Sequence, residues 1–288
     1  MITMLALLTL MRYLDPQFLY AGDNVYLSLV ILQFLIFLIP AVFYTKIKGK
    51  GYFSTLNMKM FTPDALAFIL IMSASLILGS ATLRFFCEEL SIPRSDMILM
   101  RKSFENITLS FDPFFALIAY GLVPAACEEF IFRGIMISEY RSGGRICAVI
   151  VSSLFFSFLH YGFENFILSF FIGVMLSFAV YVTGSLWSAF IIRFIYNFYS
   201  LFLESNLFEI LDRPKNNIFM IFIFGGLFLI SVVSSLGCAE KMFYSYALAG
   251  KDPPLRDDSF VWGKPSLKTA FISVPFIFCF ILYMIISI

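Results

Sequence analysis

The sequence predicts an all-α, polytopic integral membrane protein of about eight transmembrane helices with a buried polar cavity. Of its 288 residues, 60% are hydrophobic and only 14% are charged, whereas a soluble domain carries roughly 25% charged residues. Apolar runs long enough to cross a bilayer as helices, about 20 residues each, recur along the chain. They leave no room for a separate soluble domain, so we expect a single transmembrane domain over residues 1–288.

The predicted spans follow one another with mostly short connections. They cover residues 25–44, 62–83, 113–140, 146–160, 164–182, 185–203, 218–236 and 266–288. Residues 1–20 are predicted to form a short interfacial or re-entrant segment, because Arg12 and Pro16 end the apolar run at about half a membrane thickness. Residues 84–112 and 239–266 carry charges and prolines and are predicted to be exposed connections. Lys and Arg are most frequent at the face that carries the 46–59, 141–145 and 239–268 connections, so this face is predicted to be cytoplasmic.

Composition excludes several other classes of protein. The net charge of +1 gives no indication of nucleic-acid binding. The five cysteines have neither CxxC nor Cys/His zinc spacing, so we expect no disulfide framework. Glutamate, histidine and asparagine side chains could ligate a divalent ion. The chain has a single histidine, however, whereas catalytic zinc sites usually draw on more than one histidine or cysteine. We therefore expect no metal and no other cofactor.

Two adjacent carboxylates and an arginine lie in the middle of the third predicted span. Charge at this depth costs a few kcal/mol per residue, so Glu128, Glu129 and Arg133 indicate a functional site. Glu129 and Arg133 are one turn apart, in the order that favours an intrahelical ion pair. Glu128 points about 100° away from Glu129 and has no partner on its own helix. The alternative is a buried charge network that only holds helices together.

Four polar residues from three predicted helices lie at similar depths. Counted at 1.5 Å per residue from the turns at 141–145 and 183–184, the depths are about 18 Å for Glu128, about 21 Å for His160, about 20 Å for Asn197 and about 14 Å for Arg193. Arg193 and Asn197 share a helix face, as do Phe156 and His160. The sequence therefore predicts that these side chains meet in one intramembrane cavity.

Such a set of side chains suits amide hydrolysis inside a membrane. Glu128 with His160 could activate a water molecule. Asn197 and Arg193 could donate hydrogen bonds to the oxyanion that forms when the water attacks a carbonyl. A thiol nucleophile fits less well, because Cys127 faces another way. Taken singly, His160 could be a packing residue and Asn197 an interhelical hydrogen-bond donor.

Three separated motifs resemble the signatures of a known family. Glu128-Glu129-x-x-x-Arg133, Phe156-x-x-x-His160 and a third motif ending in Asn197 look like those of the CPBP (CAAX protease and bacteriocin-processing, also called Abi) intramembrane proteases, related to the type II CAAX prenyl endopeptidase. The resemblance covers about residues 113–205. It implies that Glu128 and His160 activate water, that Glu129, Arg133 and Phe156 support the site, and that the third motif forms the oxyanion hole.

The third motif departs from the family pattern, which is His-x-x-x-Asn. Here it reads Arg193-Phe-Ile-Tyr-Asn197. Arginine can donate hydrogen bonds to an oxyanion but cannot lose its proton. It could equally pair with Glu128 or Glu129.

Two functions from different classes follow from these residues. The first is a CPBP-type intramembrane endopeptidase that acts on a membrane-associated peptide or protein substrate. The second is a catalytically degenerate family member, a scaffold, regulator or bacteriocin-immunity protein that binds a membrane or secreted protein partner. A proton-coupled transporter using Glu128 is disfavoured, since the chain shows no inverted repeat. The resemblance implies a multi-pass protein of the bacterial plasma membrane.

Overall fold

A computed structural model of the chain describes residues 25–49, 51–92, 113–160, 162–204, 217–248, 250 and 267–287. All regular structure in these ranges is helical, as predicted. Five of the described helices are long and apolar enough to cross a membrane: Tyr26–Lys48, Ala65–Glu89, Pro113–Gly143, Phe163–Thr183 and Asn217–Leu248. Shorter apolar helices cover Arg145–Ser157, Leu186–Phe202 and Val274–Ile285. The prediction of an all-α, multi-pass membrane protein is confirmed at this level.

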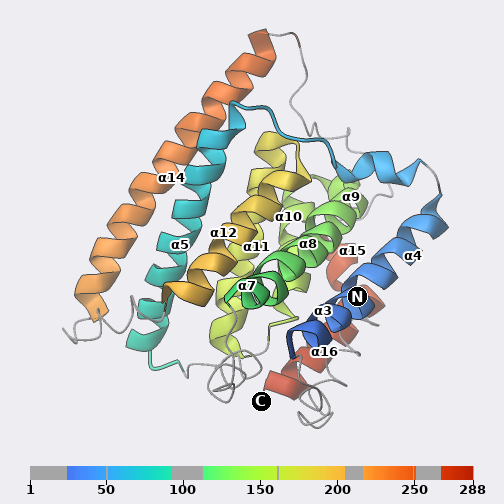
Figure 1. Cartoon of the computed structure of the whole chain (residues 1–288), viewed down its shortest axis with the longest axis horizontal. Helices are drawn as coiled ribbons and strands as arrows, with labels where there is room; N and C mark the ends of the chain where they lie inside the picture. The colour runs from blue at the N-terminus through green and yellow to red at the C-terminus, as the bar shows by residue number, and fades with distance from the viewer. Residues whose placement is uncertain are drawn as a thin grey trace.

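The described helices pack side by side in a bundle (Figure 1). At one edge α14 (Asn217–Leu248) packs along α5 (Ala65–Glu89). Next to α5 lie α11 (Phe163–Thr183) and α12 (Leu186–Phe202), and α10 (Arg145–Ser157) packs against α11. The long helix over 113–143 lies against α10 and α12, so that its middle is enclosed by other helices.

Two of the spans are α-helices interrupted by π-helical segments. The first consists of α3 (Val25–Gln33), the π segment η1 (Phe34–Leu38) and α4 (Ile39–Lys48). The third span consists, in order, of α7 (Pro113–Ala116), the π segment η3 (Leu117–Leu122), α8 (Val123–Glu129), the π segment η4 (Phe130–Met136), α9 (Ile137–Tyr140) and the 3₁₀ turn η5 (Arg141–Gly143).

Proline explains the position of two π segments. Pro40 follows η1 and Pro124 follows η3, and a proline has no N–H to give to the carbonyl four residues earlier. The chain instead closes η3 with a bond over five residues, from the Val123 N–H to the Ile118 carbonyl. Such bulges are rare and occur frequently at functional sites. Here two of them flank α8, the segment that ends with the two glutamates.

Several predicted boundaries were wrong. The helix α5 continues to Glu89, because its charged residue Arg84 finds a buried partner instead of starting a loop. The helix α14 continues to Leu248, ten residues into the predicted polar connection. The last span is broken into α15 (Leu267–Phe271) and α16 (Val274–Ser287), and Pro275 lies in the first turn of α16, where it is tolerated. The segments predicted for residues 1–20 and around Pro93 and Pro253 lie outside the described residues.

The helices α10 and α11 approach each other most closely at Gly173. A Cβ atom on Gly173 would lie 2.9 Å from the Cα and 2.8 Å from the Cβ of Ser153. The Gly173 carbonyl also accepts a hydrogen bond from the Ser177 hydroxyl at 2.8 Å. Small residues commonly permit such close backbone contact between membrane helices. The contact fixes the position of α10, and with it the position of Phe156.

We expect Gly173→Ala to destabilise the protein by about 1–3 kcal/mol, because the added methyl group must push the α10 backbone away. The matched control is Gly226→Ala on α14, where a Cβ would meet no atom within 4 Å. That substitution should be neutral or slightly stabilising, since alanine is the better helix former. Thermal unfolding of both variants in detergent measures the difference, and equal melting temperatures would contradict the close contact.

Candidate active site

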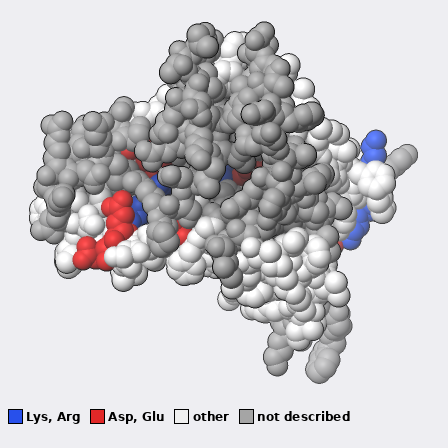
Figure 2. All heavy atoms as spheres, turned by 90° about the horizontal axis from the view of Figure 1, so that it is seen from below, with Lys and Arg blue, Asp and Glu red and all other residues white. Residues whose placement is uncertain are grey.

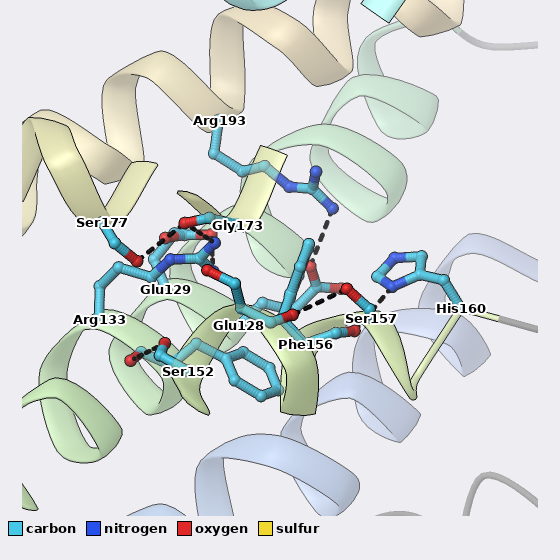
Figure 3. A network of polar contacts seen from close by, with 12 residues as sticks. Glu128, Glu129, Arg133, Ser152, Phe156, Ser157, His160, Gly173, Ser177 and Arg193 are labelled. Atoms are coloured by element: carbon cyan, nitrogen blue, oxygen red, sulfur yellow. Dashed lines mark hydrogen bonds and ion pairs between the residues drawn. The ribbon is translucent and has the colours of Figure 1, made fainter. Parts of the chain in front are cut away.

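The interior of the bundle brings together the polar residues of the three motifs, with the exception of Asn197 (Figure 3). The end of α8 and the π segment η4 carry Glu128, Glu129 and Arg133. The helix α12 carries Arg193 and Asn197. Phe156 lies in the last turn of α10, and His160 lies just beyond its end.

The predicted intrahelical ion pair is present. Arg133 Nη1 donates to Glu129 Oε1 at 3.0 Å, and the side chains are only 0% and 1% exposed. The guanidinium is held further by Nη2, which donates to the Gly173 carbonyl on α11 at 3.3 Å. A buried ion pair needs such additional hydrogen bonds to offset the cost of desolvation.

Glu128 has its partner on another helix. Arg193 Nη2 of α12 donates to Glu128 Oε2 at 3.1 Å, and the two side chains are 7% and 10% exposed. This arrangement agrees with the prediction that Glu128 has no partner on its own helix. It also places Arg193, rather than Asn197, at the level of Glu128.

Asn197 lies farther from Glu128 than its counted depth predicted. Its amide nitrogen donates to the carbonyl of Gly121 at 3.1 Å, and Gly121 precedes Glu128 by two turns of the helix. The depth count assumed upright helices with a constant rise, whereas the third span contains two π segments and the helices cross at an angle (Figure 1). Asn197 therefore lies against the π segment η3 in this structure.

Phe156 lies at the centre of the site and is completely buried. The Cζ atoms of Arg133 and Arg193 lie 4.6 and 5.0 Å from the centre of its ring. The His160 ring lies 4.7 Å away, centre to centre. A cation over an aromatic face is attracted by its negative potential, more strongly when desolvated. One aromatic ring thus connects both ion pairs and the imidazole.

We had predicted that His160 is the last residue of a helix over 146–160. In the structure α10 ends at Ser157, and His160 lies beyond it. Its Nδ1 is 3.0 Å from the Phe156 carbonyl oxygen. Because a carbonyl can only accept, we assign the proton to Nδ1, which leaves Nε2 as an acceptor. The imidazole also interacts electrostatically with Glu128 and Arg193, beside which it stands in Figure 3. His160 thus offers a basic nitrogen next to the Glu128–Arg193 pair.

Several polar atoms of the site are buried without a hydrogen-bond partner among the described residues. They are Glu129 Oε2, Arg133 Nε, Arg193 Nε and Ser153 Oγ. A buried polar atom without a partner costs about 1–3 kcal/mol. Each of these atoms therefore adds to the cost of burying the site.

The sequence reasoning missed a third buried ion pair. Arg84 Nε on α5 lies 2.8 Å from Oε1 of Glu204, just beyond α12, and Ser200 donates to Glu204 Oε2 at 2.6 Å. We had assigned Arg84 to a loop. A signal was nevertheless present, since Arg193, Ser200 and Glu204 are spaced seven and four residues apart and so share one helix face.

The described side chains offer no obvious metal site. Within the part of the chain that the structure describes, no group of three or more His, Cys, Asp or Glu residues is placed to hold a metal ion. The two glutamates of the site instead form ion pairs with the two arginines.

Comparison with known proteins identifies the central third of the chain. Residues 110–199 match the model of the family described as type II CAAX prenyl endopeptidase Rce1-like, which confirms the resemblance found from the three motifs. All residues of those motifs lie inside the matched segment. No curated protein and no solved structure matches the chain.

The Glu129–Arg133 pair allows a test of the buried charges. We expect Arg133→Met to destabilise the protein by about 3–5 kcal/mol, because it leaves the Glu129 carboxylate buried and unpaired. The double variant Glu129→Gln with Arg133→Met removes both charges and should recover most of this loss. Denaturant unfolding in detergent measures both, and equal destabilisation of the single and double variants would show that the ion pair is not formed.

Proposed function

We propose, on the basis of the match of residues 110–199 to this family, that the protein is an intramembrane endopeptidase acting on membrane-associated peptides or proteins. One observation carries the proposal. A carboxylate, an imidazole and a guanidinium, from three different elements, converge on Phe156 inside the segment that the family model matches. Structural packing alone does not require this combination at such depth.

In the proposed reaction Glu128 is the general base. A water molecule between its carboxylate and Nε2 of His160 gives its proton to Glu128, and the water oxygen attacks the carbonyl carbon of the peptide bond. His160 orients this water by accepting its second hydrogen. The proton then passes to the leaving amine as the C–N bond breaks, so the products are a carboxylic acid and an amine.

Arg193 and Asn197 are the proposed donors to the oxyanion. A guanidinium has five N–H groups, and Arg193 uses Nη2 for Glu128 while its Nε has no partner among the described residues. Asn197 has a second amide hydrogen besides the one given to Gly121. Glu129, Arg133 and Phe156 hold this set in position. The proposed mechanism is metal-free, since the chain has a single histidine and catalytic zinc sites usually draw on more than one histidine or cysteine.

The proposal includes the finer architecture. We infer that α10, α12 and α16 complete about eight membrane segments of a single domain over residues 1–288, and that the polar side chains line a cavity. Localisation in the bacterial plasma membrane is part of the same proposal.

A second candidate is favoured by the Glu128–Arg193 contact itself. Arg193 takes the carboxylate oxygen that would bind the water. A family member locked in this state would be a scaffold, regulator or immunity protein that binds a membrane or secreted partner. The two candidates differ in what a histidine at position 193 would do.

The first experiment is cleavage of a mixed library of membrane-associated peptides by the protein in nanodiscs, read by mass spectrometry. We expect Glu128→Ala to lower cleavage by about 10²–10⁴-fold, the usual contribution of a general base. The matched control is Cys127→Ala at the neighbouring buried position, which should retain cleavage. Activity that survives in Glu128→Ala would exclude Glu128 as the base.

Arg193→His separates the two candidates. If the natural protein is a peptidase, it cleaves peptides and Arg193→His only changes the rate. If the wild-type protein is inactive and Arg193→His cleaves, the ion pair has locked the site and the second candidate is correct.

A further inference from the structure

The site lies deep in the bundle, and hydrolysis there requires a supply of water. Toward the turns at 141–145 and 184 the described core beyond the site contains apolar side chains such as Ile135 and Val151, and its buried hydroxyls at Ser152, Ser177 and Thr183 already donate to backbone carbonyls. Water has few hydrogen-bond partners in such a core and is expected only where polar groups can hold it. A route from this side is therefore unfavourable.

In the opposite direction a line of polar side chains begins at the site. Arg193 Cζ lies 5.9 Å from the centre of the Tyr196 ring. Arg84 of α5 interacts electrostatically with Tyr196 and forms an ion pair with Glu204, its Nε lying 2.8 Å from Oε1. Ser200 donates to the other oxygen of Glu204. Together with the contact of Arg193 to the Tyr196 ring, these groups form a line from Glu128 to the end of α12.

The line ends where the side chains reach the surface of the bundle. Arg193 is 7% exposed, whereas Glu204 and Arg84 are 11% and 20% exposed. Figure 2 views the molecule from below the view of Figure 1, and acidic and basic atoms are visible close together on this side. This face is opposite the turn at 141–145.

The backbone near His160 gives independent support. Between α10 and α11 the described residues 158–160 and Gly162 are not helical. The helix α10 has only 13 residues, about 20 Å, so it ends before it has crossed a hydrocarbon layer of about 30 Å. Non-helical backbone at membrane depth occurs where it is buried in protein or lines a water-filled space. Ionisable residues inside spans likewise face such spaces and mark ion or proton pathways.

We propose that water and protons reach Glu128 along the face of α12 that bears Tyr196, Ser200 and Glu204, entering at the membrane face where α5 and α12 end. The positive-inside rule makes this the extracytoplasmic face. The inference rests on the proposed hydrolase function for its purpose, but its test does not need activity.

The test is labelling of single introduced cysteines by a charged, membrane-impermeant methanethiosulfonate reagent in oriented vesicles. Mass spectrometry reads each position, so the native cysteines can remain. Because only a hydrated thiol forms the reactive thiolate, Tyr196→Cys and Ser200→Cys should react about tenfold faster than their neighbours Ile195→Cys and Leu201→Cys. Ser142→Cys, in the turn at 141–145, marks the opposite side.

Arg84→Leu combined with Glu204→Leu provides the check on the route itself. Replacing this ion pair by apolar side chains should lower the labelling rate of Tyr196→Cys. This holds even if the loss of the large tyrosine side chain has itself opened space for water. Ser200→Cys is nearly isosteric with the native residue and keeps the test valid if Tyr196→Cys does not fold.

Two outcomes would overturn the inference: labelling no faster than at the neighbouring control positions, or labelling from the Ser142 side. Peptide cleavage without labelling refutes the route and leaves the peptidase function intact. Labelling without cleavage supports the route and counts against the peptidase function.

Discussion

The structure depends on neutralising buried charges inside the helix bundle, where water cannot solvate them. At the candidate site two glutamates and two arginines are buried, and each acid has its own base: Glu129 with Arg133, and Glu128 with Arg193. The two guanidiniums repel each other, yet both contact the ring of Phe156. An aromatic ring attracts both cations through its faces. The position of every helix that carries a member of this set is constrained by the same balance.

Features determined within one helix could be predicted from the sequence. The Glu129–Arg133 pair requires only a spacing of four residues, and it forms although η4 is π-helical. The lack of a helix partner for Glu128 follows from the same geometry. The apolar lengths likewise predicted which segments are long helices, because bilayer thickness sets a minimum length. For Arg193 the sequence left two roles open, oxyanion donor or counter-ion of a glutamate, and in the structure it pairs with Glu128.

Features that depend on how helices tilt and bend could not be predicted in this way. The level of Asn197 was wrong because η3 and the helix crossing move Gly121, not Glu128, next to it. His160 lies beyond α10 because the helix ends at Ser157, which no proline or glycine at that position announces. Arg84 was assigned to a loop because charge normally ends a span. Its partner Glu204 is more than a hundred residues away in the sequence.

The helix α14 has a consequence for the membrane around the protein. Its 32 residues correspond to a rod of about 48 Å, of which the apolar part before Glu240 and Lys241 spans about 34 Å, compared with about 30 Å for the hydrocarbon layer. Only one side of this rod is fixed, along α5, while most of its apolar side chains remain open to lipid. The part beyond Glu240 therefore extends past the hydrocarbon layer, and the small excess of apolar length is accommodated by tilting or by local thickening of the bilayer. The helix α14 packs along α5, and α5 carries Arg84 at the outer end of the polar line. A change in bilayer thickness that tilts α14 would therefore also displace α5 and Arg84.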